Sequence, residues 1–161
     1  MDSKPSPTPH DPSVTLRNNK KIARDQLRYF ARDQLRYSQI IGSLMYLASA
    51  ARPDISFAVN KLSRYMSNPG NDHWHALGRV LRYLKGTMSF GIHYSGHPTV
   101  LEEYSDSNWI SDIDQIYTIS GYVFTLGADA VSWRSCKQTI LTKSTMEAEL
   151  SALNTASAEA E

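Results

Sequence analysis

The spacing of apolar residues changes at Gly86, and this change constrains the fold more than any other feature of the chain. Before Gly86 apolar residues recur at helical intervals, as in Ile55, Val59 and Leu62. After it the chain contains short runs rich in β-branched and aromatic residues, such as I119-S-G-Y-V-F-T-L126. We therefore predict an α/β (α+β) fold, with a helical first part followed by a sheet.

The first 37 residues show two different biases. Residues 1–15 are rich in Pro, Ser and Asp, and because Pro removes backbone donors and favours extended chain, we expect a disordered tail. Residues 16–37 form a basic arm in which A23-R-D-Q-L-R-Y29 is repeated as A31-R-D-Q-L-R-Y37. The second copy begins eight residues after the first. On a helix this spacing turns it by about 80° from the first copy, so the two copies do not share one face. The repeat is either a duplication tolerated in an exposed segment or an arm for nucleic acid.

Residues 38–87 are predicted to form three helices. The first covers 38–50, the second begins at Pro53–Asp54, and the third begins with Asp72 as its N-cap and ends at Gly86. Residues 88–161 are predicted to form a sheet and one helix. Strands are expected at 90–94, 100–106, 120–126 and from 131 to 134 or as far as 141. The S-x-x-E spacing of Ser144 and Glu147 predicts a capping box at the start of the final helix.

Composition excludes several classes of protein. The 161 residues carry a net charge of +1, so any affinity for nucleic acid must come from local patches. Cys136 is the single cysteine, which excludes an internal disulfide. The chain shows no secretory signal, and its longest apolar stretch, 40–51, is too short to span a bilayer. We expect an intracellular protein, in the cytoplasm or nucleus, that is neither secreted nor bound to a membrane.

Several sequence blocks occur in a fixed order. They are Y37-S-Q-I-I-G-S-L-M-Y46, A51-R-P-D-I-S-F-A-V-N-K-L-S-R64, H75-A-L-G-R-V-L-R-Y-L-K-G-T87, Y104-S-D-S-N-W109, S120-G-Y-V-F124, V131-S-W-R-S-C-K-Q138 and S144-T-M-E-A-E-L150. The series resembles the end of the Pol polyprotein of copia-type LTR retrotransposons, over about residues 35–158. The resemblance implies a helical, thumb-like end of reverse transcriptase, followed by an RNase H-like mixed sheet.

The resemblance also implies a chemistry. The RNase H domain of that family cuts the RNA strand of an RNA–DNA hybrid with two Mg²⁺ ions, which bind carboxylate oxygens and substrate phosphate. Asp106 matches the first catalytic and metal-binding aspartate, and Glu149 matches the glutamate of the helix. Glu147 is the competitor of Glu149, and we assign it a structural role in the capping box.

The sequence departs from the family pattern at its end. The family has a further aspartate and a late acidic or histidine ligand, both of which would lie beyond Glu161, and the polymerase Tyr-x-Asp-Asp segment is also missing. We expect an incomplete RNase H-like sheet whose 100–106 strand is an open edge. An open edge favours a homo-oligomer or the capture of a partner strand.

Basic residues form a second candidate site. His75, Arg79 and Arg82 share one face of a predicted helix, and Lys61 and Arg64 lie one helix earlier. They would bind the phosphates of an RNA–DNA hybrid or another nucleic acid, or else form a solvated basic face.

Three functional classes therefore compete. The favoured one is a catalytically incomplete retrotransposon fragment that binds nucleic acid. The second is a Mg²⁺-dependent hybrid ribonuclease completed by a partner or by a longer parent chain. The third is a domesticated protein-interaction module.

Overall fold

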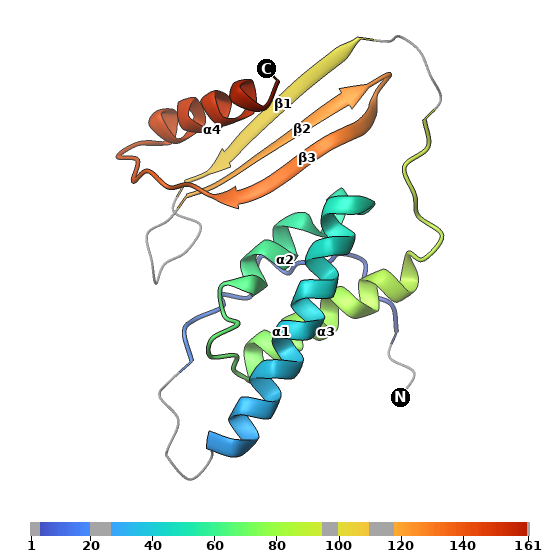
Figure 1. The fold of residues 1–161 in the computed structure, drawn as a ribbon, viewed down its shortest axis with the longest axis vertical. Coiled ribbons are helices and arrows are strands. Elements are labelled where there is room, and N and C mark those ends of the chain that lie inside the picture. The colour runs from blue at the N-terminus through green and yellow to red at the C-terminus, as the bar shows by residue number, and fades with distance from the viewer. Residues whose placement is uncertain (1–3, 20–26, 95–99, 110–117, 161) are drawn as a thin grey trace. The chain divides into compact units, whose positions relative to one another are not determined.

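The structure, a computed structural model, describes residues 4–19, 27–94, 100–109 and 118–160 (Figure 1). The chain divides into two compact units, Met1–Phe90 and Gly91–Glu161. The division falls three residues after the boundary expected between 87 and 88. Most of the first copy of the repeat lies outside the described residues, as do Asp112 and Asp114, two acidic residues that we expect to be solvated in a turn-like segment.

The first unit is built from helices. They are α1 (Leu27–Ala50), the short 3-10 helix η2 (Pro53–Ile55), α2 (Ser56–Ser63) and α3 (Asn71–Gly86). Helix α1 begins well before the expected residue 38, so the second copy of the repeat is helical. Its Ala, Arg, Gln and Leu residues favour a helix, and its last residue, Tyr37, is fully buried. The predicted second helix is divided into η2 and α2.

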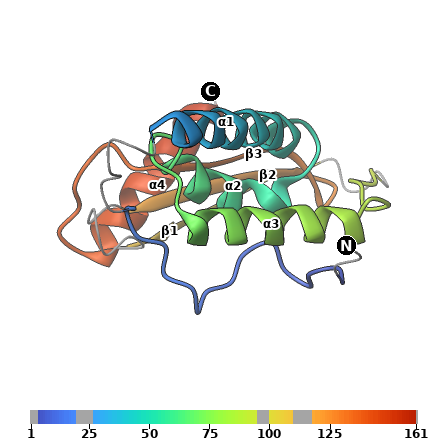
Figure 2. The ribbon, with the colours of Figure 1, turned by 90° about the horizontal axis from the view of Figure 1, so that it is seen from below.

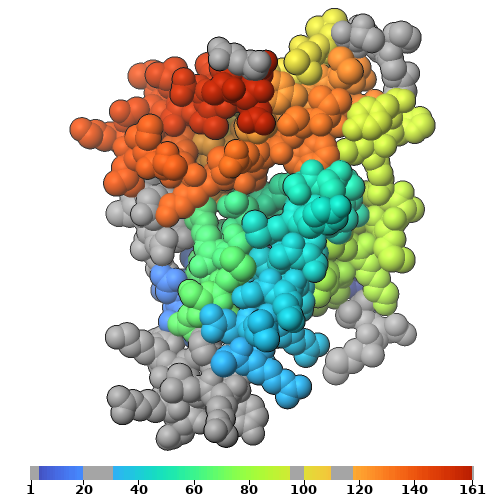
Figure 3. Space-filling view, viewed as in Figure 1, coloured from blue at the N-terminus to red at the C-terminus, as the bar shows by residue number. Residues whose placement is uncertain are grey.

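Aromatic side chains join these helices. Tyr37 of α1 lies edge-to-face on Trp74 of α3, with ring centroids 5.3 Å apart. Its hydroxyl also donates a 3.0 Å hydrogen bond to the carbonyl oxygen of Leu62 in α2. In the space-filling view α1 and the green segment containing α2 pack side by side (Figure 3). The core around them consists of Leu16, Tyr37, Ile41, Leu44, Ala48, Ile55, Ala58, Val59, Leu62, Tyr65, Leu77, Val80 and Tyr83.

Helix α3 begins differently from the prediction. Its N-cap is Gly70 rather than Asp72, which lies in the first turn. The Gly70 N–H donates to Nδ1 of His73 at 2.7 Å, and the His73 side chain is buried. The imidazole therefore satisfies a backbone donor at the helix start, where Asp72 contributes only its charge.

The N-terminal segment, which we define as residues 4–19, packs along the helices without regular secondary structure. Figure 2 shows it in blue beside α3. Leu16 is 5% exposed, and the Tyr65 hydroxyl donates to its carbonyl oxygen at 3.2 Å. Leu16 directly follows the stretch 1–15 for which we expect a disordered tail, and one buried leucine gives no periodic signal from which its packing could be predicted.

The second unit contains a three-stranded antiparallel sheet and one helix. The strands β1 (Leu101–Asn108), β2 (Ile119–Leu126) and β3 (Asp129–Lys137) follow the spatial order β1-β2-β3. Within the described residues β1 is thus an outer strand, as expected. The predicted strand at 90–94 is wrong: these residues have no strand structure. A five-residue pattern containing Gly91 does not determine pairing, which needs a neighbouring strand.

Helix α4 (Thr145–Ala160) covers one face of this sheet along β1 and β2 (Figure 1). Its buried side chains are Ala148, Ala152 and Ala156, spaced by one helical turn. Tyr122 and Phe124 of β2 pack with Ala156 in a small core. Small alanines let the helix lie close to the aromatic strand residues.

The predicted capping box of α4 is confirmed, except that the Glu147 side chain binds one residue earlier than expected. The Glu147 N–H donates to Oγ of Ser144 at 3.2 Å, as expected. The Glu147 carboxylate accepts a 2.6 Å hydrogen bond from the N–H of Lys143, one residue before the cap. Glu147 therefore has the structural role that the sequence predicts.

Candidate functional site

Asp106, the first expected metal ligand, lies near the end of β1. In the strand register it is opposite Gly121, while its neighbour Ser107 is opposite Ser120. Ser120 accepts a hydrogen bond from Gln138, which also binds the carbonyl oxygen of Ala148 in α4. Because side chains alternate along a strand, Ser107 is on the α4 face and Asp106 is on the opposite face. Asp106 is exposed there.

Glu149, the second expected ligand, follows the buried Ala148 in α4 and is half-buried. Asp106 therefore belongs to the sheet face opposite α4, whereas Glu149 belongs to α4 itself. In the part of the chain that the structure describes, no three His, Cys, Asp or Glu side chains are grouped so that they could hold a metal ion. Carboxylate oxygens suit Mg²⁺, but the described residues do not supply the several ligands that a two-metal site needs.

Four of the five predicted phosphate-binding residues gather at one pocket of the first unit. Lys61 of α2 and His75, Arg79 and Arg82 of α3 line one pocket of about 240 Å³. The predicted fifth residue, Arg64, follows α2 and is not part of the lining. The structure thus brings together side chains that the helical spacing had placed on one face, and adds Lys61 from the neighbouring helix.

The other wall of this pocket is the N-terminal segment. Its lining residues are Pro9, His10, Asp11, Val14 and Leu16. Ala58, Leu62 and Ala76 add apolar lining from the helices, and we call the cationic side chains Lys61, Arg79 and Arg82 the basic rim. Sequence reasoning did not include this segment in the site. Its one local signal was D11-P-S13, where an Asp side chain can cap its own turn.

Arg79 is the residue most firmly held by that segment. Its Nε donates to the carbonyl oxygen of Thr8 at 3.1 Å, and its Nη2 donates to Oγ1 of Thr8 at 3.0 Å. Its Nη1 forms a 3.0 Å ion pair with Oδ2 of Asp11. The other oxygen of Asp11 accepts hydrogen bonds from the N–H and hydroxyl of Ser13, at 3.1 and 2.6 Å. These Ser13 bonds, followed by the charge of Arg79, lower the pKa of Asp11 despite an opposing effect of desolvation.

Three cationic side chains, Lys61, Arg79 and Arg82, and two carboxylates, Asp11 and Asp72, give the pocket lining a small net positive charge. Lys61 Nζ lies 5.9 Å from the ring centre of Phe57, and the His10 ring meets the same ring edge-on at 5.3 Å. Partial burial, and then the charge of Lys61, lower the pKa of His10. The carboxylate of Asp11 acts in the opposite direction, and Arg79 adds a smaller lowering effect.

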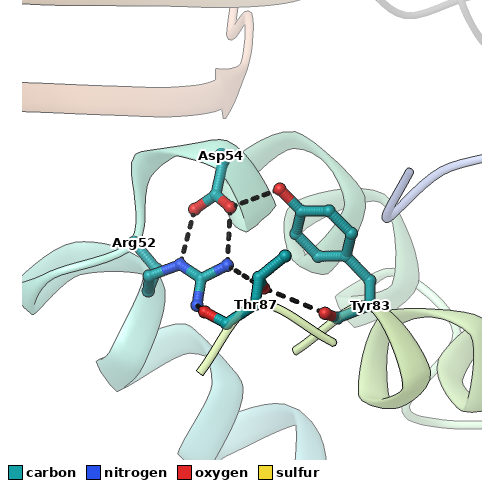
Figure 4. A network of polar contacts seen from close by, with 4 residues as sticks. All are labelled: Arg52, Asp54, Tyr83 and Thr87. Atoms are coloured by element: carbon teal, nitrogen blue, oxygen red, sulfur yellow. Dashed lines mark hydrogen bonds and ion pairs between the residues drawn. The ribbon is translucent and has the colours of Figure 1, made fainter. Parts of the chain in front are cut away.

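A second polar cluster in this unit is structural. Arg52, Asp54, Tyr83 and Thr87 bind one another at the junction of η2 and the end of α3 (Figure 4). Arg52 is 7% exposed, and its Nη1 and Nη2 donate to the carbonyl oxygen and hydroxyl of Thr87 at 3.0 and 2.7 Å. The sequence predicted Asp54 only as part of the start of a helix.

Helices that could span a membrane are not found among the described residues. The chain matches no protein-family model. No solved structure matches it either.

Known sequences, in contrast, match nearly the whole chain. It is 42% identical over 161 residues to the retrovirus-related Pol polyprotein from transposon RE2 of Arabidopsis thaliana, covering 98% of this chain and 10% of that protein. It is 42% identical over 113 residues to the corresponding polyprotein from transposon TNT 1-94 of Nicotiana tabacum, covering 70% of this chain and 8% of that protein. The chain thus spans about a tenth or less of the length of these polyproteins.

A relative of similar length also matches. The secreted RxLR effector protein 161 of Plasmopara viticola is 42% identical over 125 residues, which are 77% of this chain and 88% of that protein. Its name describes that protein and does not assign a compartment to this one. The Pol polyprotein matches agree with the resemblance that the ordered sequence blocks carry. The chain belongs to the family of retrovirus-related Pol polyproteins of copia-type transposons.

Proposed function

We propose that these residues are the part of a retrotransposon Pol protein where the end of reverse transcriptase meets the RNase H domain, and that their own activity is to bind nucleic acid. The basic pocket rim supports this most directly. Lys61, Arg79 and Arg82 come from two helices and line one hollow. Positive side chains gathered in this way bind phosphates by displacing condensed counterions.

Binding of this kind depends steeply on salt, which makes the proposal testable. If three phosphates are contacted, the logarithm of the association constant should fall with the logarithm of salt concentration with a slope of about −2 to −3. Fluorescence anisotropy with a labelled RNA–DNA hybrid measures this slope. We expect Lys61→Ala to weaken binding and to make the slope less steep by about one.

A matched control removes a positive charge elsewhere. Lys143 lies in the second unit, exposed, before α4. The Lys143→Ala variant keeps the backbone N–H that binds Glu147 and should bind the hybrid nearly as the unaltered chain does. Equal losses from both variants, or binding that does not depend on salt, would contradict a role for the basic rim.

We further propose that the 161 residues by themselves do not cleave a hybrid. Among the described residues no group of three His, Cys, Asp or Glu side chains could hold a metal ion, and a two-metal reaction requires several closely placed ligands. The purified chain should show no more Mg²⁺-dependent cleavage of a labelled hybrid than its Asp106→Asn and Glu149→Gln variants. Cleavage that both substitutions abolish would contradict this proposal, because the purified chain, alone or as a homo-oligomer, would then supply its own metal ligands.

The outer position of β1 favours a second candidate function, a protein-interaction module. Within the described residues its backbone pairs on one side with β2. The free side can accept a strand from a second copy or another protein. Sedimentation from low to high micromolar concentration should show the mass of the chain rising toward a dimer. A constant monomer mass would contradict self-association through this edge.

A further inference from the structure

We propose that residues 8–11 mask the basic surface, because Asp11 and Thr8 present oxygen atoms to Arg79 where a nucleic-acid phosphate would bind. This inference rests on the proposed nucleic-acid binding and adds its regulation. We call these four residues the mask. Nucleic acid would then bind fully only when the mask leaves Arg79.

The contacts of Arg79 resemble those that a phosphate makes. All three of its donor nitrogens that bind the mask meet oxygen atoms: the carbonyl and hydroxyl of Thr8 and the carboxylate of Asp11, at 3.0 to 3.1 Å. A guanidinium offers a planar fork of donors that suits carboxylate and phosphate alike. The occupant seen here is a side chain of the same protein, so a phosphate has to compete with it.

The mask is held in place locally on both sides. On the N-terminal side of Asp11, Oγ1 of Thr8 donates to the carbonyl oxygen of His10 at 2.9 Å. After it, Asp11 caps its own turn through Ser13, and the Val14 N–H donates to the Asp11 carbonyl oxygen at 3.2 Å. Leu16 then anchors the segment in the core.

The anchoring and the masking are carried by different parts of the segment. Arg79 and Asp11 have side chains that are 26% and 33% exposed, so water reaches their ion pair. Surface pairs of this kind contribute little energy, and phosphate can replace the carboxylate. Leu16 and the Tyr65 hydrogen bond stay buried when the mask opens. Opening therefore needs no unfolding of the helices.

The test compares Asp11→Asn with Asp33→Asn in the full chain. Both remove one negative charge from the first unit, but Asp33 is exposed on α1 and does not line the pocket. With a labelled RNA–DNA hybrid at low salt, Asp11→Asn should bind about two- to fivefold more tightly than Asp33→Asn. Its salt slope should match that of the unaltered chain, because Arg79 contacts a phosphate in both complexes once the mask has opened.

The outcomes separate the two proposals. If Asp11→Asn binds like Asp33→Asn while the unaltered chain binds with a salt slope, the mask is wrong and the proposed function stands. If no variant binds, both proposals fail. Thermal unfolding of each variant establishes that the comparison is between folded chains.

A second measurement uses the unaltered chain. Hydrogen exchange of the Val14 N–H should become faster when the hybrid is bound, because its acceptor is the Asp11 carbonyl oxygen in the masking turn. The exchange of the Tyr37 N–H, at a fully buried position of α1, serves as the internal reference and should not become faster. Unchanged or slower exchange at Val14 in a bound sample would overturn the mask.

Discussion

Arg52 donates two hydrogen bonds to the carboxylate of Asp54, from Nε to Oδ1 at 2.9 Å and from Nη2 to Oδ2 at 2.7 Å. The Tyr83 hydroxyl donates to the same carboxylate at 2.7 Å. The three side chains thereby connect η2 to α3, two elements separated by a turn and a helix. The paired geometry satisfies a guanidinium that is almost completely buried.

Asp54→Asn should lower the free energy of unfolding by about 2 kcal/mol, because the buried Arg52 loses its charged acceptor. Tyr83→Phe removes a single hydrogen bond and should cost about 1 kcal/mol. Urea unfolding followed by helical circular dichroism measures both. A loss for Asp54→Asn no larger than that for Tyr83→Phe would show that the charge of Asp54 is not needed.

The pH dependence of the same carboxylate follows from its bonds. Partial burial acts to raise the pKa of Asp54, but hydrogen bonds from Arg52 and Tyr83 outweigh it and hold the pKa below its usual value. The stability that Asp54 adds is therefore present above about pH 4 and is lost as the pH falls through its folded pKa. The Asp54→Asn variant should lose less stability in acid than the unaltered chain.

Tyr37, the last residue of the repeat, provides a test of how α1 packs against its neighbouring helices. Its hydroxyl is buried against the carbonyl oxygen of Leu62, and burial raises its pKa. Tyr37→Phe keeps the ring on Trp74 but removes the donor, and should lower the free energy of unfolding by about 1 to 2 kcal/mol. Tyr46→Phe alters a ring that is 76% exposed on the same helix and should change it by less than about 0.5 kcal/mol.

His73 should make the first unit sensitive to weak acid. Its Nδ1 accepts the Gly70 N–H, and burial lowers its pKa, against smaller opposing effects of Arg17 and Asp72. In weak acid the unfolded chain therefore binds a proton at His73 more readily than the folded chain does. Stability is therefore complete above about pH 6.5 and decreases as the pH falls below that value.

Denaturant unfolding at several values between pH 5 and 8 should show this slope. The His73→Asn variant keeps an acceptor oxygen near the cap and cannot titrate in this range. Its stability should vary less with pH, whatever its absolute value. An equal slope in both chains would assign the pH dependence to other groups.

Gln138 holds the second unit together in a comparable way. Its Nε2 donates to Oγ of Ser120 at 2.6 Å and to the carbonyl oxygen of Ala148 at 2.8 Å, joining the sheet to α4. Gln138→Glu places a carboxylate against that carbonyl oxygen and should destabilise this unit by about 2 kcal/mol or more at pH 7. Ser120→Ala removes one acceptor and should cost about 1 kcal/mol. Hydrogen exchange of the β2 amides reports on this unit separately.

The turn between β2 and β3 offers a stabilising substitution. Gly127 and Ala128 have φ angles of 62° and 69°, the left-handed region that both central residues of a type I′ turn require. For alanine this region costs about 1 kcal/mol, so Ala128→Gly should raise the stability of the second unit by about 0.5 kcal/mol after the added chain entropy is subtracted. A decrease, measured by thermal unfolding, would show that the strain is relieved in solution.

Local patterns determined several parts of this protein from sequence alone. The ordered blocks established the family, and the runs after residue 100 indicated the three strands, since side-chain alternation is a local property. The capping spacing of Ser144 and Glu147 identified the start of α4. The helical spacing of His75, Arg79 and Arg82 placed them on one face, which they share in the pocket.

Only the tertiary structure decided how distant parts meet. The sequence names Asp106 and Glu149 as candidate ligands, and strand register, which depends on pairing with β2, determines the face on which Asp106 lies. The N-terminal segment has no periodicity, yet Leu16 and Asp11 bind partners more than 45 residues away. Its placement depends on a surface that exists only after α2 and α3 have packed. Local spacing thus identified the elements, whereas non-local burial and hydrogen bonding selected the residues that meet.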